Sequence, residues 1–364
     1  KAHLDELALA TWKLYNDVPK MERVLAGKYI LGGDINYNGE YLLPIANARL
    51  TGFDNIGSSR RSAQSLTWKN ILQPITPNWN DWNFGVNEGE KESTFKGSNP
   101  LQKPFTGILD GNGYSIINAQ LVYDNYLTRN DSANPKTFNA SGAQFLGLNS
   151  GTLRNISFED VRFTKNLGTL YDGVTIVSDR SKYSYAFAKS HFNTDANGLV
   201  YQNNASGVVE NVFISLKIKT TWQLFQPSAI AVRDNKGTVK NVVVVHEGGT
   251  LPSTSSESQV NSEIGSACAL RHLAAVNTGT FTDSFAVYKP TTGSIDYVNL
   301  GAVGSNCVKV TSLTGADANS LATKVESGAY SLTSFDTDIW DIDLSSGSGT
   351  FKLKKGNYWS LSQQ

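Results

Sequence analysis

The segment FLGLNSGTLRNISF, residues 145–158, contains the pattern from which the fold is predicted. It contains a short apolar strand, a turn with Asn and Gly, and a second strand that an Asn interrupts. The same order recurs as LVYQNNASGVVENVFI at 199–214, IAVRDNKGTVKNVVV at 230–244 and AAVNTGTFTDSFA at 274–286. One such unit is too thin to bury its own apolar face. The recurrence therefore predicts a stack in which neighbouring units share one continuous core.

Each repeat has a glycine in its turn, which gives the alignment: Gly151, Gly207, Gly237 and Gly279. An apolar residue stands two positions after each glycine, and an Asn or Asp stands four positions after it. Residues two apart share one face of a strand, so both side chains are expected to point into the core. The polar one is expected at a corner, where it can bond backbone groups that the bend leaves unpaired. A divergent fifth copy, DGNGYSIINAQL, begins at residue 110. The predicted ladder of stacked polar residues is Asn118, Asn155, Asn211, Asn241 and Asp283.

These copies resemble the GLUG-type repeats of bacterial surface proteins, and residues 145–158 match that pattern best. Residues 29–46 and 105–121 look like the first strands of such domains. Residues 335–356 resemble their closing strand, with Trp340 packing against the end of the coil. The resemblance implies a right-handed parallel β-helix and an adhesin-like role. Similar repeats also accompany IgA-type proteases as non-catalytic regions.

The predicted fold is all-β: a right-handed parallel β-helix, or solenoid, with a short N-terminal helix and long loop insertions. The apolar stripe of LDELALATWKLY predicts a helix over residues 4–16, which Pro19 ends. Residues 1–23 then form a helical cap or linker, 24–356 the coil, and 357–364 a tail. The insertions are expected at about 58–103, 122–142, 166–198 and 246–270.

Composition excludes several classes of partner. The chain has 32 Lys and Arg against 32 Asp and Glu, without a basic run, so we expect no nucleic-acid binding. It has no apolar run long enough for a membrane span, so we expect no membrane insertion. Frequent Gly with only 18% charged residues favours a secreted or cell-surface β-protein. Cys268 and Cys307 either form one disulfide or remain two free thiols.

Motifs for chemistry are incomplete. Asp34-x-Asn36-x-Asn38-Gly39 matches the first half of a calcium loop but lacks the acid at its twelfth position, and a strand turn explains it better. His246-Glu247-Gly248-Gly249 lacks the second His of a zinc-protease helix. We therefore predict no metal, no cofactor and no catalytic residue. A glycosidase-type carboxylate pair is the open alternative. The acids at strand ends or turns are Asp34, Asp110, Asp160, Asp234 and Asp283.

One insertion is rich in aromatic residues. NWNDWNF, residues 78–84, places Trp and Phe beside Asn and Asp, a combination that suits stacking on sugar rings and hydrogen bonding to hydroxyls. A cluster that holds a long loop against the coil would need the same residues. The candidate glycan-binding residues are Trp68, Trp79, Trp82 and Phe84.

The leading prediction of function is a non-catalytic exported scaffold or adhesion protein. It would present loops to a glycan, to a host protein surface or to a neighbouring subunit of a homo-oligomer. Two alternatives stay open on the same fold, because a fold does not specify an activity. One is a polysaccharide hydrolase or lyase, and the other is a phage or virion appendage or capsid-decoration protein.

Overall fold

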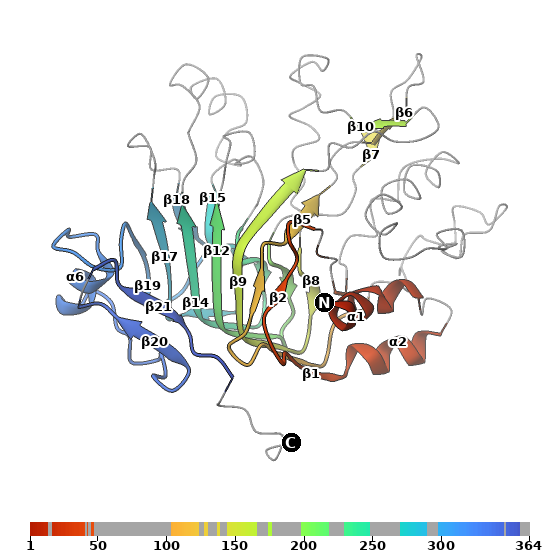
Figure 1. The fold of residues 1–364 in the computed structure, drawn as a ribbon, viewed down its shortest axis with the longest axis horizontal. Helices are drawn as coiled ribbons and strands as arrows, with labels where there is room; N and C mark the ends of the chain where they lie inside the picture. Colours follow the sequence, from red (N-terminus) through yellow and green to blue (C-terminus); the bar gives the residue numbers. More distant parts are fainter. Residues whose placement is uncertain are drawn as a thin grey trace.

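The structure is a computed structural model, and every statement below concerns the residues that it describes. These are residues 1–13, 17–40, 42, 45–46, 103–123, 127–129, 137–138, 144–165, 174–176, 198–217, 229–247, 270–289, 298–345 and 347–356. The described part consists mostly of β-strands in long parallel sheets, with few helices (Figure 1). It is therefore an all-β parallel fold.

Two helices open the chain, where the sequence predicted one. Helix α1 (Ala2–Lys13) lies in the predicted region. Helix α2 (Val18–Leu25) was not predicted, because Pro19 was interpreted only as the end of the first helix. Proline is tolerated in the first turn of a helix, and the Asp17 side chain caps this helix by accepting a hydrogen bond from the Lys20 amide at 3.1 Å. The helical region thus extends to Leu25.

The larger sheet contains eleven described strands, and all of their pairings are parallel. Its main path in spatial order is β1 (Lys28–Ile30), β3 (Ile108–Asp110), β9 (Thr152–Lys165), β12 (Val208–Lys217), β14 (Thr238–Glu247), β17 (Ser284–Lys289) and β19 (Cys307–Val310). Four short strands extend it: β2 (Ile35–Asn36), β4 (Ser115–Ile117), β5 (Gln120–Tyr123) and β16 (Thr280–Thr282).

A second parallel sheet has five described strands. In spatial order they are β18 (Val298–Gly301), β15 (Leu270–Asn277), β13 (Val232–Asn235), β11 (Val200–Asn203) and β8 (Leu146–Asn149). The chain alternates between the sheets, because β8, β11, β13 and β15 are each followed by a turn and a strand of the larger sheet. Equivalent repeat positions become neighbours: Val209 pairs with Leu153 on one side and Val239 on the other. This register agrees with the alignment from the turn glycines.

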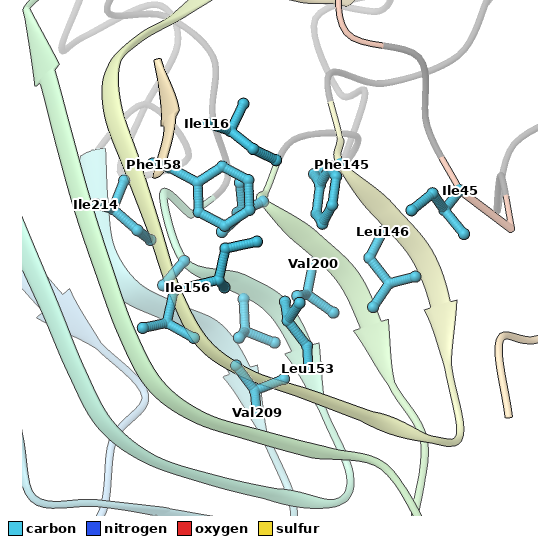
Figure 2. Packing of buried hydrophobic residues seen from close by; sticks show 14 of the residues in the cluster. Ile45, Ile116, Phe145, Leu146, Leu153, Ile156, Phe158, Val200, Val209 and Ile214 are labelled. Atoms are coloured by element: carbon cyan, nitrogen blue, oxygen red, sulfur yellow. The ribbon is translucent and has the colours of Figure 1, made fainter. Parts of the chain in front are cut away.

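The main core lies between the two sheets. Figure 2 shows Leu153, Ile156 and Val209 of the larger sheet facing Leu146 and Val200 of the second sheet. All five side chains are buried, and each contributes about 1.5–3 kcal/mol relative to an exposed position. Leu4, Leu7, Met21 and Leu25 of the helices belong to the same core, so the helices pack on the stacked strands.

The C-terminal part covers the outer side of the larger sheet. Helix α6 (Leu321–Glu326) follows β19, and β20 (Trp340–Asp343) pairs antiparallel with β21 (Thr350–Leu353). We call the described residues from 330 to 356 the C-terminal strap. Val243 and Phe285, which alternate with core residues along β14 and β17, pack in a second apolar cluster with strap residues such as Trp340. Trp340 therefore packs against the side of the sheet, and the prediction that it packs against the end is wrong.

Candidate functional site

Asn155, Asn211 and Asn241 form a hydrogen-bonded row across β9, β12 and β14, which we call the corner row. Nδ2 of Asn211 donates to Oδ1 of Asn155 over 3.0 Å, and Nδ2 of Asn241 donates to Oδ1 of Asn211 over 3.0 Å. All three residues are buried and have φ between 52° and 54°. Asn tolerates this left-handed conformation better than most non-glycine residues, which explains its recurrence at the bend.

The corner row ends at Asp110 on β3. Nδ2 of Asn155 lies 3.3 Å and 3.4 Å from the two carboxylate oxygens of Asp110. Nε of Arg154 donates to Oδ2 of Asp110 over 2.7 Å, so the buried carboxylate has a charged partner. A buried carboxylate that is paired and hydrogen-bonded in this way is a structural element, because its charge is already compensated.

Asn118 does not belong to the corner row, and the alignment of the fifth repeat is wrong there. Asp110 pairs with Arg154 in the sheet register, so the residue beside Asn155 is Gly111. The turn at Asn112 and Gly113 lies inside this repeat, which moves Asn118 to a different bend.

Asp283 sits at the corresponding bend of a later repeat, with φ of 53°. Its hydrogen-bond partner is Asn306, whose Nδ2 donates to Oδ1 of Asp283 over 2.7 Å. Asn306 has φ of 50°, so it occupies the same kind of bend. The sequence alignment did not include Asn306, because the segment before it lacks the turn pattern of the other repeats.

The corner row contacts the C-terminal strap, although its side chains were expected to point into the main core. Nε1 of Trp340 donates to Oδ1 of Asn211 over 3.2 Å, and Nδ2 of Asn241 donates to the Ser334 carbonyl over 3.0 Å. The left-handed residue interrupts the in-and-out alternation of the strand, which is why the strand-period argument gave the wrong direction. The row thus fastens the strap to the sheet.

A second Asn row, which the sequence analysis missed, lies at the turns that lead from the second sheet into the larger sheet. It runs from Asn149 through Asn203 and Asn235 to Asn277, with each Nδ2 donating to the next Oδ1 over 2.8 Å. The available signal was an Asn two positions before the turn glycine in three of the repeats. In the repeat with Asn203 the glycine follows four positions later, which obscured the pattern.

Five segments leave the larger sheet and enter the second sheet, and we call them the inserts. They are residues 124–143, 166–197, 218–228, 248–269 and 290–297. They follow β5, β9, β12, β14 and β17 in turn, and they precede β8, β11, β13, β15 and β18. Because these strands are parallel neighbours, the inserts start and finish along one side of the molecule, which we call the insert edge (Figure 1). The predicted insertion 58–103 differs, since it falls between Ala46 and Phe105, which both border β8.

Two consecutive inserts pair with each other. Strands β6 (Leu127–Arg129) and β7 (Thr137–Phe138) come from the first insert, and β10 (Val174–Ile176) comes from the second. They form one antiparallel sheet in the order β10-β6-β7, which lies beyond the ends of β5 and β9 (Figure 1). The insert edge therefore supports a small sheet that two inserts build together.

Two buried histidines lie at the insert edge. Nδ1 of His246, near the end of β14, is 3.2 Å from Nε2 of His272, near the start of β15. The exposed fractions are 1% for His246 and 0% for His272. Burial lowers the pKa of His246 to about 4. The sequence reading considered His246 only as part of a zinc motif and did not pair it with His272.

Three of the five acids considered for a glycosidase-type carboxylate pair have separate charged partners. Asp34 bonds Lys355 and the Ser115 amide, whereas Asp110 bonds Arg154. Asp234 lies 3.5 Å from the Lys236 ammonium. Among the described residues, no group of three or more His, Cys, Asp or Glu could hold a metal ion. The half calcium loop is a strand turn in which the Asn38 amide donates to Oδ1 of Asn36 over 2.8 Å.

Several predicted residues lie outside the described part of the chain. The glycan candidates Trp68, Trp79, Trp82 and Phe84 are among them, and so is Cys268. Cys307 is a free thiol, and burial raises its pKa to about 11. Within the described residues, no helix has the length and apolar character that a membrane crossing requires.

Comparison with protein-family models, curated proteins and solved structures finds no match to this chain. The resemblance to GLUG-type repeats stays a prediction.

Proposed function

We propose that this chain is a non-catalytic scaffold of the right-handed parallel β-helix type that presents its inserts to a partner outside the cell. The insert edge is the observation that carries this proposal. Successive inserts start and finish along one side, and two of them share a small sheet. A rigid stack that gathers variable segments on one side is suited to recognition, since binding residues concentrate on loops that a scaffold positions.

The β-helix assignment rests on the alternation between two parallel sheets. Each repeat adds one strand to the second sheet and one to the larger sheet, with the repeats in register. Two rows of Asn side chains follow the stacking direction at the two turns. Repeated coils stacked on a common core account for all three features.

A glycan is the partner class that we favour. The support is compositional and comes from the separate insertion 58–103, which is not one of the five inserts: its residues 78–84 combine two Trp and a Phe with Asn and Asp. Aromatic faces stack on the apolar faces of sugar rings, while amides and carboxylates bond the hydroxyls.

The test is binding of the full chain to a printed array of glycans. A variant with Trp79→Ala and Trp82→Ala removes the stacking faces, whereas the matched control with Trp79→Phe and Trp82→Phe keeps them. We expect array signals that the alanine variant loses and the phenylalanine variant largely retains. Equal signals from the wild-type chain and the alanine variant would contradict a role for these residues. A silent array would contradict glycan binding, and sedimentation would then test a second copy of the chain as partner.

A further inference from the structure

The buried pair of His246 and His272 has no counterpart in the neighbouring repeats. In the sheet register, the position of His246 is occupied by Leu216 on β12 and by Tyr288 on β17. Val161 stands beside Leu216 on β9. The stack therefore accepts an aliphatic side chain at this position, and a buried imidazole there costs free energy unless it is hydrogen-bonded. The fold alone does not explain the choice of histidine.

The hydrogen bond within the pair limits how many protons the pair can hold. Nδ1 of His246 and Nε2 of His272 are 3.2 Å apart, so a single proton lies between them. If both rings were protonated, two N–H groups would point at each other across that distance, and both rings would be cationic. The pair in its present geometry therefore excludes the doubly protonated state.

Even one added proton is unfavourable in these surroundings. The Tyr288 ring lies 5.0 Å from the His246 ring and 6.2 Å from the His272 ring, and Leu216 adjoins His246 from the other side. The sequence neighbours of His272 on β15 are Arg271 and Leu273, which offer no carboxylate to stabilise an imidazolium. Nε2 of His246 is buried without a hydrogen-bond partner in the described structure, so its added proton would also lack an acceptor.

The position of the pair determines which strands its protonation would separate. His246 precedes the insert 248–269 and His272 follows it, so the hydrogen bond joins the two ends of that insert across the interior. We infer that the His246–His272 pair is an acid-sensitive contact that holds the end of β14 to the start of β15 at neutral pH and lets these two strand ends separate in acid. In that separation the two imidazoles move apart, each takes up a proton, and water reaches both. The inference does not depend on what the inserts bind.

Hydrogen exchange on the full chain tests the inference. Amide protection is measured at about pH 7.5 and about pH 4.5 and corrected for the intrinsic pH dependence of exchange. The peptides that report are residues 238–247 and 270–277, and residues 152–165 and 208–217 serve as the internal reference. The variant is His246→Leu, which introduces the residue found at the same register position on β12. The matched control is His3→Gln, which alters an exposed histidine on α1.

In the wild-type chain and the His3→Gln control, acid should lower protection of the reporting peptides by about tenfold or more relative to the reference peptides. In the His246→Leu variant the ratio should stay constant between the two pH values. A constant ratio in the wild-type chain would overturn the inference, as would a uniform loss of protection in all four regions. An equal acid response in the His246→Leu variant would overturn it too. If that variant does not fold, the regional comparison within the wild-type chain decides.

Discussion

At the scale of single residues, Asn211 holds the largest number of partners in the corner row. It bonds Asn155, Asn241 and the indole of Trp340 while its own φ is 52°. Replacing Asn211 by Leu removes these bonds and places a branched side chain in the left-handed region. We expect a loss of about 2–4 kcal/mol in the free energy of unfolding. Urea denaturation measures it.

The variant Asn211→Gly separates the two contributions. Glycine adopts the left-handed conformation freely but makes no side-chain bonds. It should therefore be about 1–2 kcal/mol more stable than Asn211→Leu, because glycine avoids the steric cost of the left-handed conformation. Equal stabilities for the wild-type chain and both variants would show that the corner row does not stabilise the fold.

His246 should make stability depend on pH. Its pKa is about 4 in the folded chain and about 6.5 when unfolded, so below pH 6.5 the unfolded state binds the extra proton. Stability from this residue is therefore full above pH 6.5 and falls as the pH drops toward 4, by roughly 2 kcal/mol at pH 5. Denaturation curves at several pH values should show this slope in the wild-type chain. A slope of the same size in His246→Leu would assign it to other groups.

Residue by residue, the sequence predicted what repeats regularly and missed what depends on distant contacts. The spacing from the turn glycines identified Asn155, Asn211 and Asn241, because a bend repeated in register needs a residue that tolerates positive φ. The direction of these side chains could not be predicted, since their partner Trp340 is far away in sequence. The pairing of His246 with His272 was missed for a similar reason: a long insert separates them.

At the scale of elements, the C-terminal strap forms an additional layer that packs on the outer side of the larger sheet. Trp340 is 1% exposed and packs on Phe335 and Phe351, with ring centroids 5.3 Å away in both cases. Trp340→Ala should cost about 3–5 kcal/mol in the free energy of unfolding, as for other buried aromatic truncations. Trp340→Phe keeps most of the packing and loses the bond to Asn211, so it should cost clearly less. Chemical denaturation compares the two variants, and equal losses would mean that the indole bond matters more than the packing.

Local signals predicted the strands of the repeats better than the elements at either end. A repeat strand carries its own alternation and its own turn glycine, whereas the strap strand β20 pairs antiparallel with β21 in a separate two-stranded sheet. Helix α2 illustrates the ambiguity of proline, which ends one helix and begins another within a few residues. The sequence at Asp17 and Pro19 contained the start signal, but it was read as a stop signal alone.

At the scale of the whole molecule, the repeats are held together by contacts between neighbouring strands. The strap also links the last strands of the stack to the first ones. Lys355 of the strap pairs with Asp34, and the Gly356 amide donates to the Asn112 carbonyl over 2.8 Å. The strap thus runs from the last strands back to the first ones. Stability should accordingly depend on the stacked strands and the strap, and only weakly on the length of an insert.

Exchanging one insert for another tests this separation of roles. Residues 248–269 are replaced by a copy of the shorter segment 290–297, which already connects equivalent strands of the same two sheets. Loop-closure entropy changes slowly with length, so the free energy of unfolding should change by only about 1 kcal/mol. Thermal denaturation and far-ultraviolet circular dichroism measure the outcome. A large loss of stability would mean that the insert is part of the packed structure, and the division between a stacked scaffold and the segments it presents would then fail at this insert.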